Sequence, residues 1–137
     1  MRVSHITLSG PEFVIPAMRV TRNKSFKTPK KPKLETWYRA LITQHSPIRA
    51  VNYRIYCEDV PYFVAMHFRT HHVGVQFYIG SQRLINDEDR SKLPQDALVN
   101  MMFDINPQAL INLSRLRLCS KSNKITRKLM NMIKRNF

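Results

Sequence analysis

An amphipathic helical pattern begins at Asn106-Pro107 and continues almost to the end of the chain. Asparagine is a favoured N-cap, and proline is well accepted at the first helical position, so this pair predicts a helix start. Apolar residues then recur on one helical face: Ala109, Leu110, Leu113, Leu116, Ile125, Leu129, Met132 and Ile133. Lys128, Lys134 and Arg135 suit the negative pole of the helix dipole. We therefore expect a long C-terminal helix with a buried face.

Two more helices and a strand are expected upstream. Apolar residues at helical spacing predict a helix over 34–45, which Ser46-Pro47 ends because the residue before proline avoids the α conformation. Alternating apolar and polar residues predict a strand over 49–57. Asp59 is the expected N-cap of a helix that continues to about His71.

The other segments complete an α+β architecture, in which a small antiparallel sheet packs against two or three helices. Residues 1–20 are expected to form an edge strand or an irregular arm, 73–93 a loop with short extended pieces, and 94–103 a short helix. We expect the chain to consist of an N-terminal arm with a basic linker over 1–33 and a single domain over 34–137.

Composition excludes several classes of protein. The three glycines, Gly10, Gly74 and Gly80, form neither a Rossmann fingerprint nor a P-loop. The two cysteines, Cys57 and Cys119, cannot build a zinc ribbon or a disulfide framework, which fits a reducing cytoplasm. The apolar runs are far shorter than a membrane span, and no signal-peptide pattern is present. We expect a cytoplasmic protein (in the host cytoplasm if it is viral) that is not associated with a membrane.

The net charge of +14 is concentrated at the two ends of the chain. Residues 1–35 carry +6 and residues 113–137 carry +8, whereas residues 36–112 are neutral. This distribution indicates an anionic partner, either nucleic acid or a phosphorylated nucleotide or cofactor. The Lys-rich segment 24–33 fits a solvated linker as well as a binding site.

Three histidines, His67, His71 and His72, lie on or just beyond the helix that begins at Asp59. His67 and His71 share a face at i, i+4, but a zinc site needs at least one more ligand. No Glu follows His67, so the HExxH motif is absent. We expect no metal here, and the histidines either contact a phosphate or cofactor or serve in packing.

Cys119 has two interpretations. Arg115, Arg117 and Lys121 are its neighbours in sequence, and their charges could lower the pKa of a nucleophilic thiol. A lone cysteine on an apolar helix is, however, more often a small core residue. Both interpretations stay open at this point.

Arg83, Arg90 and Arg117 come from two connecting segments and from the C-terminal helix, so folding could bring them together. Guanidinium groups bind phosphate through paired, charge-assisted hydrogen bonds. The residues alone therefore indicate a small α+β domain with a phosphate site, unless each arginine is simply a surface residue.

Asn106, Asn112 and Arg117 also have the spacing of an Asn, a second Asn and an Arg in the late helix of flavin-dependent thymidylate synthases. The three positions match without a gap, and segment 106–120 resembles that helix. This is the first motif of a family resemblance.

Four shorter motifs extend the resemblance in the same order along the chain. Residues 90–94 (Arg-Ser-Lys-Leu-Pro) resemble the family's Arg-x-x-Leu-Pro, and residues 81–83 (Ser-Gln-Arg) resemble its Ser-x-Arg substrate loop. Ser46-Pro47 is similar to a Thr/Ser-Pro pair, and residues 61–65 are similar to the start of a helix that leads to the family signature. The resemblance covers about residues 40–128.

The resemblance implies an enzyme that methylates the uracil of dUMP to give dTMP. Methylenetetrahydrofolate would supply the carbon, and FAD reduced by NADPH would supply the hydride. No cysteine nucleophile is needed in this family. Its flavin lies between the subunits of a homotetramer, so a homo-oligomer is implied.

The resemblance also gives individual residues a role. Arg117 would be catalytic, because it would hold and polarise the pyrimidine. The residues that would bind dUMP and its phosphate are His67, Ser81, Gln82, Arg83, Arg90 and Arg117. The residues that would contact FAD are Ser46, Arg69, His71, His72, Asn106 and Asn112.

The chain departs from the family pattern at three points. Where the family has Arg-His-Arg, this chain has either Thr70-His71-His72 or His71-His72-Val73, depending on where one inserted residue falls. Arg69 could replace a lost guanidinium. Gln44 stands near the place of an early histidine, and the chain is much shorter than typical members, as in a viral or otherwise reduced homologue. Two alternatives therefore stay open: a nucleotide-binding homologue without flavin chemistry, and a basic nucleic-acid-binding protein.

Overall fold

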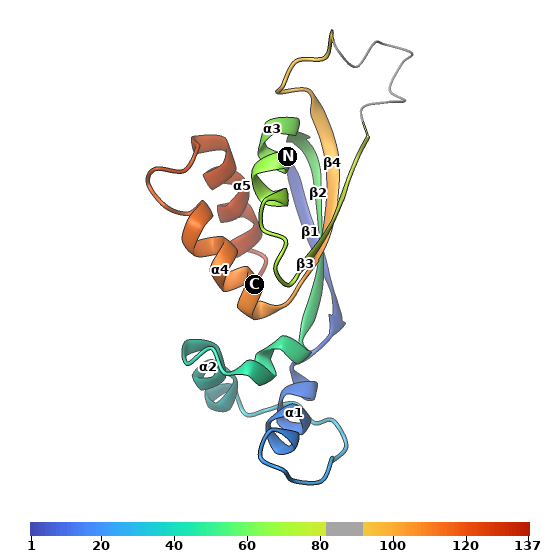
Figure 1. The fold of residues 1–137 in the computed structure, drawn as a ribbon, viewed down its shortest axis with the longest axis vertical. Coiled ribbons are helices and arrows are strands. Elements are labelled where there is room, and N and C mark those ends of the chain that lie inside the picture. The colour runs from blue at the N-terminus through green and yellow to red at the C-terminus, as the bar shows by residue number, and fades with distance from the viewer. Residues whose placement is uncertain (82–91) are drawn as a thin grey trace.

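The computed structural model describes residues 1–81 and 92–137, and it contains a four-stranded antiparallel sheet in the order β1-β2-β4-β3 (Figure 1). The strands are β1 (Arg2–Ser9), β2 (Asn52–Pro61), β3 (Val75–Ile79) and β4 (Leu98–Ile105). The helices are α1 (Val14–Val20), α2 (Leu34–Ile42), α3 (Tyr62–Arg69), α4 (Pro107–Arg117) and α5 (Lys124–Lys134), with short 3-10 turns η1 (Pro11–Phe13) and η2 (Ser46–Ala50). The predicted α+β class is confirmed.

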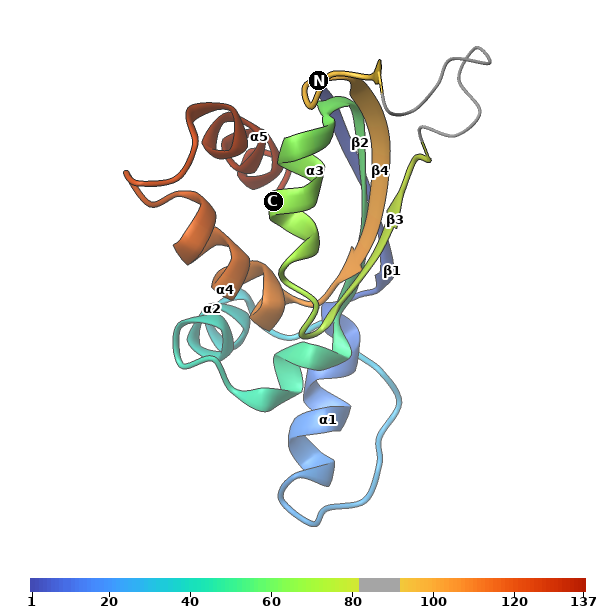
Figure 2. The ribbon, with the colours of Figure 1, turned by 45° about the horizontal axis from the view of Figure 1, so that its top comes forward.

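The core lies between the sheet and one layer of helices, α3, α4 and α5 (Figure 2). The side chains that the two central strands bury against these helices are Ile55, Cys57, Val60, Val99, Met101, Phe103 and Ile105. Phe68, Leu113 and Leu129 meet them from the three helices. The opposite face of the sheet carries polar pairs, among them Arg54, which donates to both carboxylate oxygens of Asp104 at 2.7 Å each.

The N-terminal arm begins with an edge strand, as predicted. β1 pairs antiparallel with β2, so this part of the arm belongs to the same sheet as the rest of the chain. α1 follows it and was not predicted, although Val14 at its start is fully buried. The predicted helix over 34–45 corresponds to α2, and η2 after it packs against α1 and α4.

Asp59 does not cap a helix, so that prediction is wrong. β2 continues through an irregularity between Cys57 and Val60, where Asp59 adopts a left-handed φ of 55°. The Asp59 N–H donates to Oδ1 of Asn100 at 3.2 Å, and α3 begins only at Tyr62. The Asp-Pro signal of a helix start coincides here with a β-bulge, where aspartate tolerates the unusual backbone.

The prediction of a short helix over 94–103 is also wrong. These residues lead into β4, which is paired with β2 on one side and β3 on the other. Val99, Met101 and Phe103 are buried and alternate with more exposed residues, which is the period of a strand. β3 itself is one of the extended pieces expected within 73–93.

The C-terminal helical region is present, but the structure divides it into α4 and α5. Asn106 caps α4 as predicted, because its Oδ1 accepts from the Ala109 N–H at 2.9 Å. A second cap starts α5: Oδ1 of Asn123 accepts from the N–H groups of Ile125 at 2.8 Å and Thr126 at 3.5 Å. The break turns α5 back beside α4, so the apolar faces of both helices reach the core. No helix in the described part of the chain is long and apolar enough to cross a bilayer.

We expect Asn123→Ala to lower the free energy of unfolding by about 1 kcal/mol, because it removes the cap that starts α5. Asn123→Asp keeps an acceptor and should retain most of the stability. Asn131→Ala, an exposed position in the middle of α5, is the matched control and should not lower it. Urea denaturation followed by circular dichroism measures all three, and equal losses at positions 123 and 131 would contradict the capping role.

Candidate active site

A cavity of about 140 Å³ lies between the turn that follows α3 and the middle of α4. His71 and His72 line it from the turn, and Asn112 lines it from the helix. All three were predicted from sequence to contact FAD. Folding therefore brings together residues of one predicted site that are far apart in the chain.

Gly74 lets this turn approach α4 closely. Its φ of 74° lies in the left-handed region that favours glycine. A Cβ at this position would stand 3.2 Å from Nδ2 of Asn106 and 3.3 Å from Cβ of Ala109. Asn106 thus lies against the turn while its Oδ1 caps α4. The structure gives Asn106 this capping role, and its contact with FAD stays a prediction.

Arg117, in the last turn of α4, is bonded to the end of α3. Its Nη2 donates to the carbonyl oxygen of His67 at 2.5 Å and to Oγ1 of Thr70 at 2.9 Å. Its Nε is buried and has no hydrogen-bond partner among the described residues. Burial lowers the pKa of Arg117, but a guanidinium stays protonated at neutral pH. Arg117 does not line the cavity, but Thr70, to which it donates, does, so a positive charge with an unused donor lies close to the cavity.

The second buried nitrogen without a partner belongs to His71. Its Nε2 has no hydrogen-bond partner in the part of the chain that the structure describes. The pKa of His71 is lowered from its ordinary 6.5, first by burial and then by the positive charges of Arg117 and His72. The imidazole is therefore neutral at pH 7, and its Nε2 can donate or accept a hydrogen bond, depending on the tautomer.

A pair of glutamines connects this site with the turn between α2 and η2. Nε2 of Gln108 donates to Oε1 of Gln44 at 2.7 Å and approaches Oδ1 of Asn112 at 3.5 Å. Gln108 was not identified from sequence. Its position four residues before Asn112, on the same helical face, was the available signal.

The ring of His67 belongs to the packing between α3 and α5. Its Nδ1 lies 2.9 Å from Oγ1 of the buried Thr126, and its ring meets that of Phe63 edge-on. His71 lies beyond the end of α3, so His67 and His71 do not share a helical face. Among the described residues, no group of three His, Cys, Asp or Glu side chains is close enough to hold a metal ion.

The other predicted site residues fall into two groups. Ser46 is exposed at the start of η2, Arg69 is exposed at the end of α3, and Ser81 is exposed after β3. The predicted residues outside the described part of the chain are Gln82, Arg83 and Arg90. The roles given to all six toward FAD and dUMP stay predictions.

Neither cysteine lines this cavity. Cys57 is buried in β2, and burial raises its pKa to about 12, so its thiol is inert at neutral pH. Cys119 is exposed, and the interpretation as a core residue is wrong because α4 ends at Arg117 and leaves Cys119 in the connection to α5.

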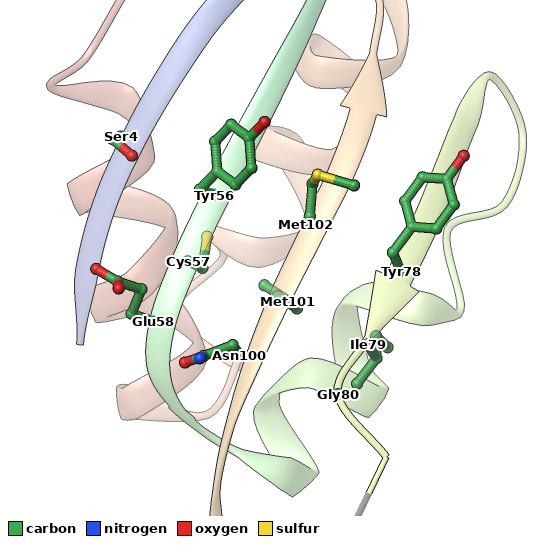
Figure 3. Close-up of a pocket in the computed structure, with 10 residues that line it drawn as sticks. All are labelled: Ser4, Tyr56, Cys57, Glu58, Tyr78, Ile79, Gly80, Asn100, Met101 and Met102. Atoms are coloured by element: carbon green, nitrogen blue, oxygen red, sulfur yellow. The ribbon is translucent and has the colours of Figure 1, made fainter.

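The open face of the sheet carries a separate hollow of about 540 Å³ (Figure 3). Tyr56 of β2 and Tyr78 of β3 flank Met102 of β4, which is the register partner of both. Figure 3 shows all three side chains projecting from the same face. Because α4 covers the other face, this hollow is not part of the candidate active site.

Solved structures match the whole chain, although no protein-family model and no curated protein sequence matches it. Thymidylate synthase X from Helicobacter pylori, in a structure with FAD and dUMP, matches with a TM-score of 0.79 and 13% identity over 100% of this chain and 93% of that chain. A second structure, a flavin-dependent thymidylate synthase from Helicobacter pylori complexed with FAD and dUMP, gives a TM-score of 0.74 and 13% identity over 100% and 94%. The protein therefore has the fold of flavin-dependent thymidylate synthases, and the resemblance found in its motifs is confirmed for the fold.

We expect Arg117→Gln to raise the pKa of His71 toward 6.5, because the substitution removes one of the two positive charges that, after burial, lower it. Arg115→Gln, an exposed position of the same helix, is the matched control and should leave that pKa unchanged. NMR titration of the His71 ring signals measures the effect. An identical His71 titration in wild type and Arg117→Gln would contradict the electrostatic contact.

Proposed function

We propose that this protein methylates dUMP to dTMP in a flavin-dependent reaction that uses methylenetetrahydrofolate and NADPH. The proposal rests on two buried nitrogens that have no hydrogen-bond partner among the described residues. They are Nε2 of His71, which lines the cavity, and Nε of Arg117, which is bonded to the cavity residue Thr70. Buried polar atoms in proteins are nearly always hydrogen-bonded, so two unused ones close to one cavity support a polar ligand there.

The residues around the cavity fit the polar edge of a flavin ring. His71, His72 and Asn112 would hold FAD through ring and amide nitrogens, with Arg69, Ser46 and Asn106 as further contacts. Reduced FAD, when bound, supplies the hydride of the reaction. Ligand pockets usually measure about 300–1,000 Å³, so a cavity of about 140 Å³ would hold only part of this cofactor.

A neighbouring subunit would supply the missing wall, so a homo-oligomer belongs to the proposal, as a homotetramer by resemblance to the family. The open sheet face offers a surface for such contacts, because Ile6, Leu8 and Tyr78 are exposed on the strands there. The two free cysteines fit a cytoplasmic location, which we also infer.

Arg117 would act on the pyrimidine of dUMP. Its Nη2 is held by His67 and Thr70, so the guanidinium would stay fixed while Nε binds substrate. A preorganised positive charge stabilises negative charge that develops on a pyrimidine carbonyl. His67 would contribute through this bond, since its ring is engaged with Thr126. The residues proposed for the remaining contacts with dUMP and its phosphate are Ser81, Gln82, Arg83 and Arg90.

A second candidate function is a nucleotide-binding homologue that lacks flavin chemistry. It is favoured by one observation, the absence of both arginines of the family's Arg-His-Arg signature from residues 70–73, which read Thr-His-His-Val. Such a protein would bind dUMP through Arg117 without retaining FAD.

The absorbance spectrum of the purified protein distinguishes the two candidates. We expect bound FAD, directly or after reconstitution, and oxidation of NADPH that depends on dUMP. In parallel, the binding of dUMP is measured by titration calorimetry. Binding of dUMP by a protein that never takes up FAD would support the second candidate, and binding of neither would contradict both.

We expect Arg117→Lys to reduce dTMP formation about 100-fold, because lysine keeps the charge but not the geometry of the guanidinium. Arg115→Lys, an exposed position on α4 outside the cavity, is the matched control and should keep the wild-type rate. Circular dichroism verifies that both variants fold. A wild-type rate in Arg117→Lys would show that Arg117 does not act on the substrate.

A further inference from the structure

A second helical groove lies on the other side of α4, between α4 and α5, with a volume of about 680 Å³. Its walls are mostly apolar and include Leu110, Ile111, Leu118, Met130 and Phe137. The candidate active site is lined by different α4 residues, among them Ala109 and Asn112, so the two cavities share no side chain. The proposed reaction makes no use of this groove.

The walls of the groove are held in place by the fold. Met130 is fully buried, and Leu110 and Leu118 pack against the core. The Phe137 ring, which is half-exposed, contacts two other rings, with centroid distances of 4.6 Å to His5 and 4.7 Å to Tyr53. An apolar ligand would therefore meet a preformed surface.

The rim of the groove is positively charged. Arg115 and Lys134 line it, and neither side chain has an ion pair or hydrogen bond within the described residues. No Asp or Glu follows Asp104 in the sequence, so α4 and α5 contain no carboxylate side chain to neutralise them. An anionic group at this rim would gain charge-assisted hydrogen bonds without displacing an existing partner.

From the apolar walls and this cationic rim we infer a binding site for a small amphipathic anion. Its acyl or aromatic body would lie against Leu110, Ile111 and Leu118, and its carboxylate, sulfonate or phosphate head would meet Arg115 and Lys134. A volume of about 680 Å³ falls within the range of small-molecule pockets, which are mostly apolar with a few placed polar groups. We therefore assign the groove to a free ligand of this class, not to a membrane surface or a partner protein.

Two probes test the assignment on the full-length protein: anilinonaphthalene sulfonate, followed by fluorescence, and laurate below its micellar concentration, followed by displacement of the first probe. Lys134→Glu should weaken binding of both about tenfold at low salt, because it replaces a charge-assisted contact with repulsion. Lys128→Glu is the matched control, since it makes the same change of charge on an exposed position of α5 outside the groove. It should leave the affinity nearly unchanged.

A second pair of variants tests the apolar wall. Ile111→Glu places a carboxylate inside the groove and should abolish binding of both probes, because an anionic ligand would meet a like charge. Leu116→Glu, an exposed position on the same helix outside the groove, should bind them as wild type does. Circular dichroism tests whether both variants fold. If Ile111→Glu does not fold, Ile111→Ser takes its place.

Cys119 gives a reporter that does not depend on fluorescence. It lines the groove and is exposed, whereas Cys57 is buried, so a neutral alkylating reagent should modify Cys119 alone in the folded protein. Saturating laurate should slow that modification several-fold. Loss of protection in Lys134→Glu but not in Lys128→Glu would support the site.

Three outcomes would overturn the assignment. Equal weakening by Lys134→Glu and Lys128→Glu would show attraction to the net positive charge only. Probe binding without protection of Cys119 would place the ligand elsewhere. Protection by anionic lipid vesicles, with none by laurate, would identify the groove as a membrane-binding surface.

Discussion

The bond from Arg117 to the end of α3 determines the geometry of the candidate active site. Nη2 of its guanidinium donates to the carbonyl oxygen of His67 and to the hydroxyl of Thr70. These hydrogen bonds join α4 to the turn that carries His71 and His72. Nε of the same guanidinium is buried and has no hydrogen-bond partner among the described residues. Burial, together with the charge of this guanidinium and that of His72, lowers the pKa of His71. The position of the turn and part of the pKa shift of His71 therefore depend on one side chain, that of Arg117.

Successive residues of α4 point in different directions around the helix axis, so the helix has two different surfaces. Asn112 and Ala109 face the turn after α3, whereas Ile111 and Leu118 face the groove beside α5. The break at residues 118–123 makes the second surface possible, because a continuous helix would carry the α5 residues away from α4. A third surface is formed by the row of Tyr56, Met102 and Tyr78. It lies on the opposite face of the sheet and is separate from the two surfaces of α4.

Features encoded locally were predictable from the sequence, and features that depend on distant partners were not. Asn106 caps α4 because cap and helix are adjacent in the chain. β4 was mistaken for a helix because its conformation depends on pairing with β2 and β3. In the site, motif spacing identified Asn112, His71 and His72, which line one cavity. It did not identify Gln108, because its partner Gln44 lies far away in sequence, and it did not show that the ring of His67 would be engaged by Thr126.

The central claim is that FAD and dUMP bind where the turn after α3 meets α4. Hydrogen exchange of backbone amides, followed by mass spectrometry with and without both ligands, tests it most directly. Bound ligands should slow exchange in residues 70–75 and 106–117 and leave the outer strand β1 unchanged. Ligand binding that slows exchange elsewhere, with no change in these two segments, would contradict the account.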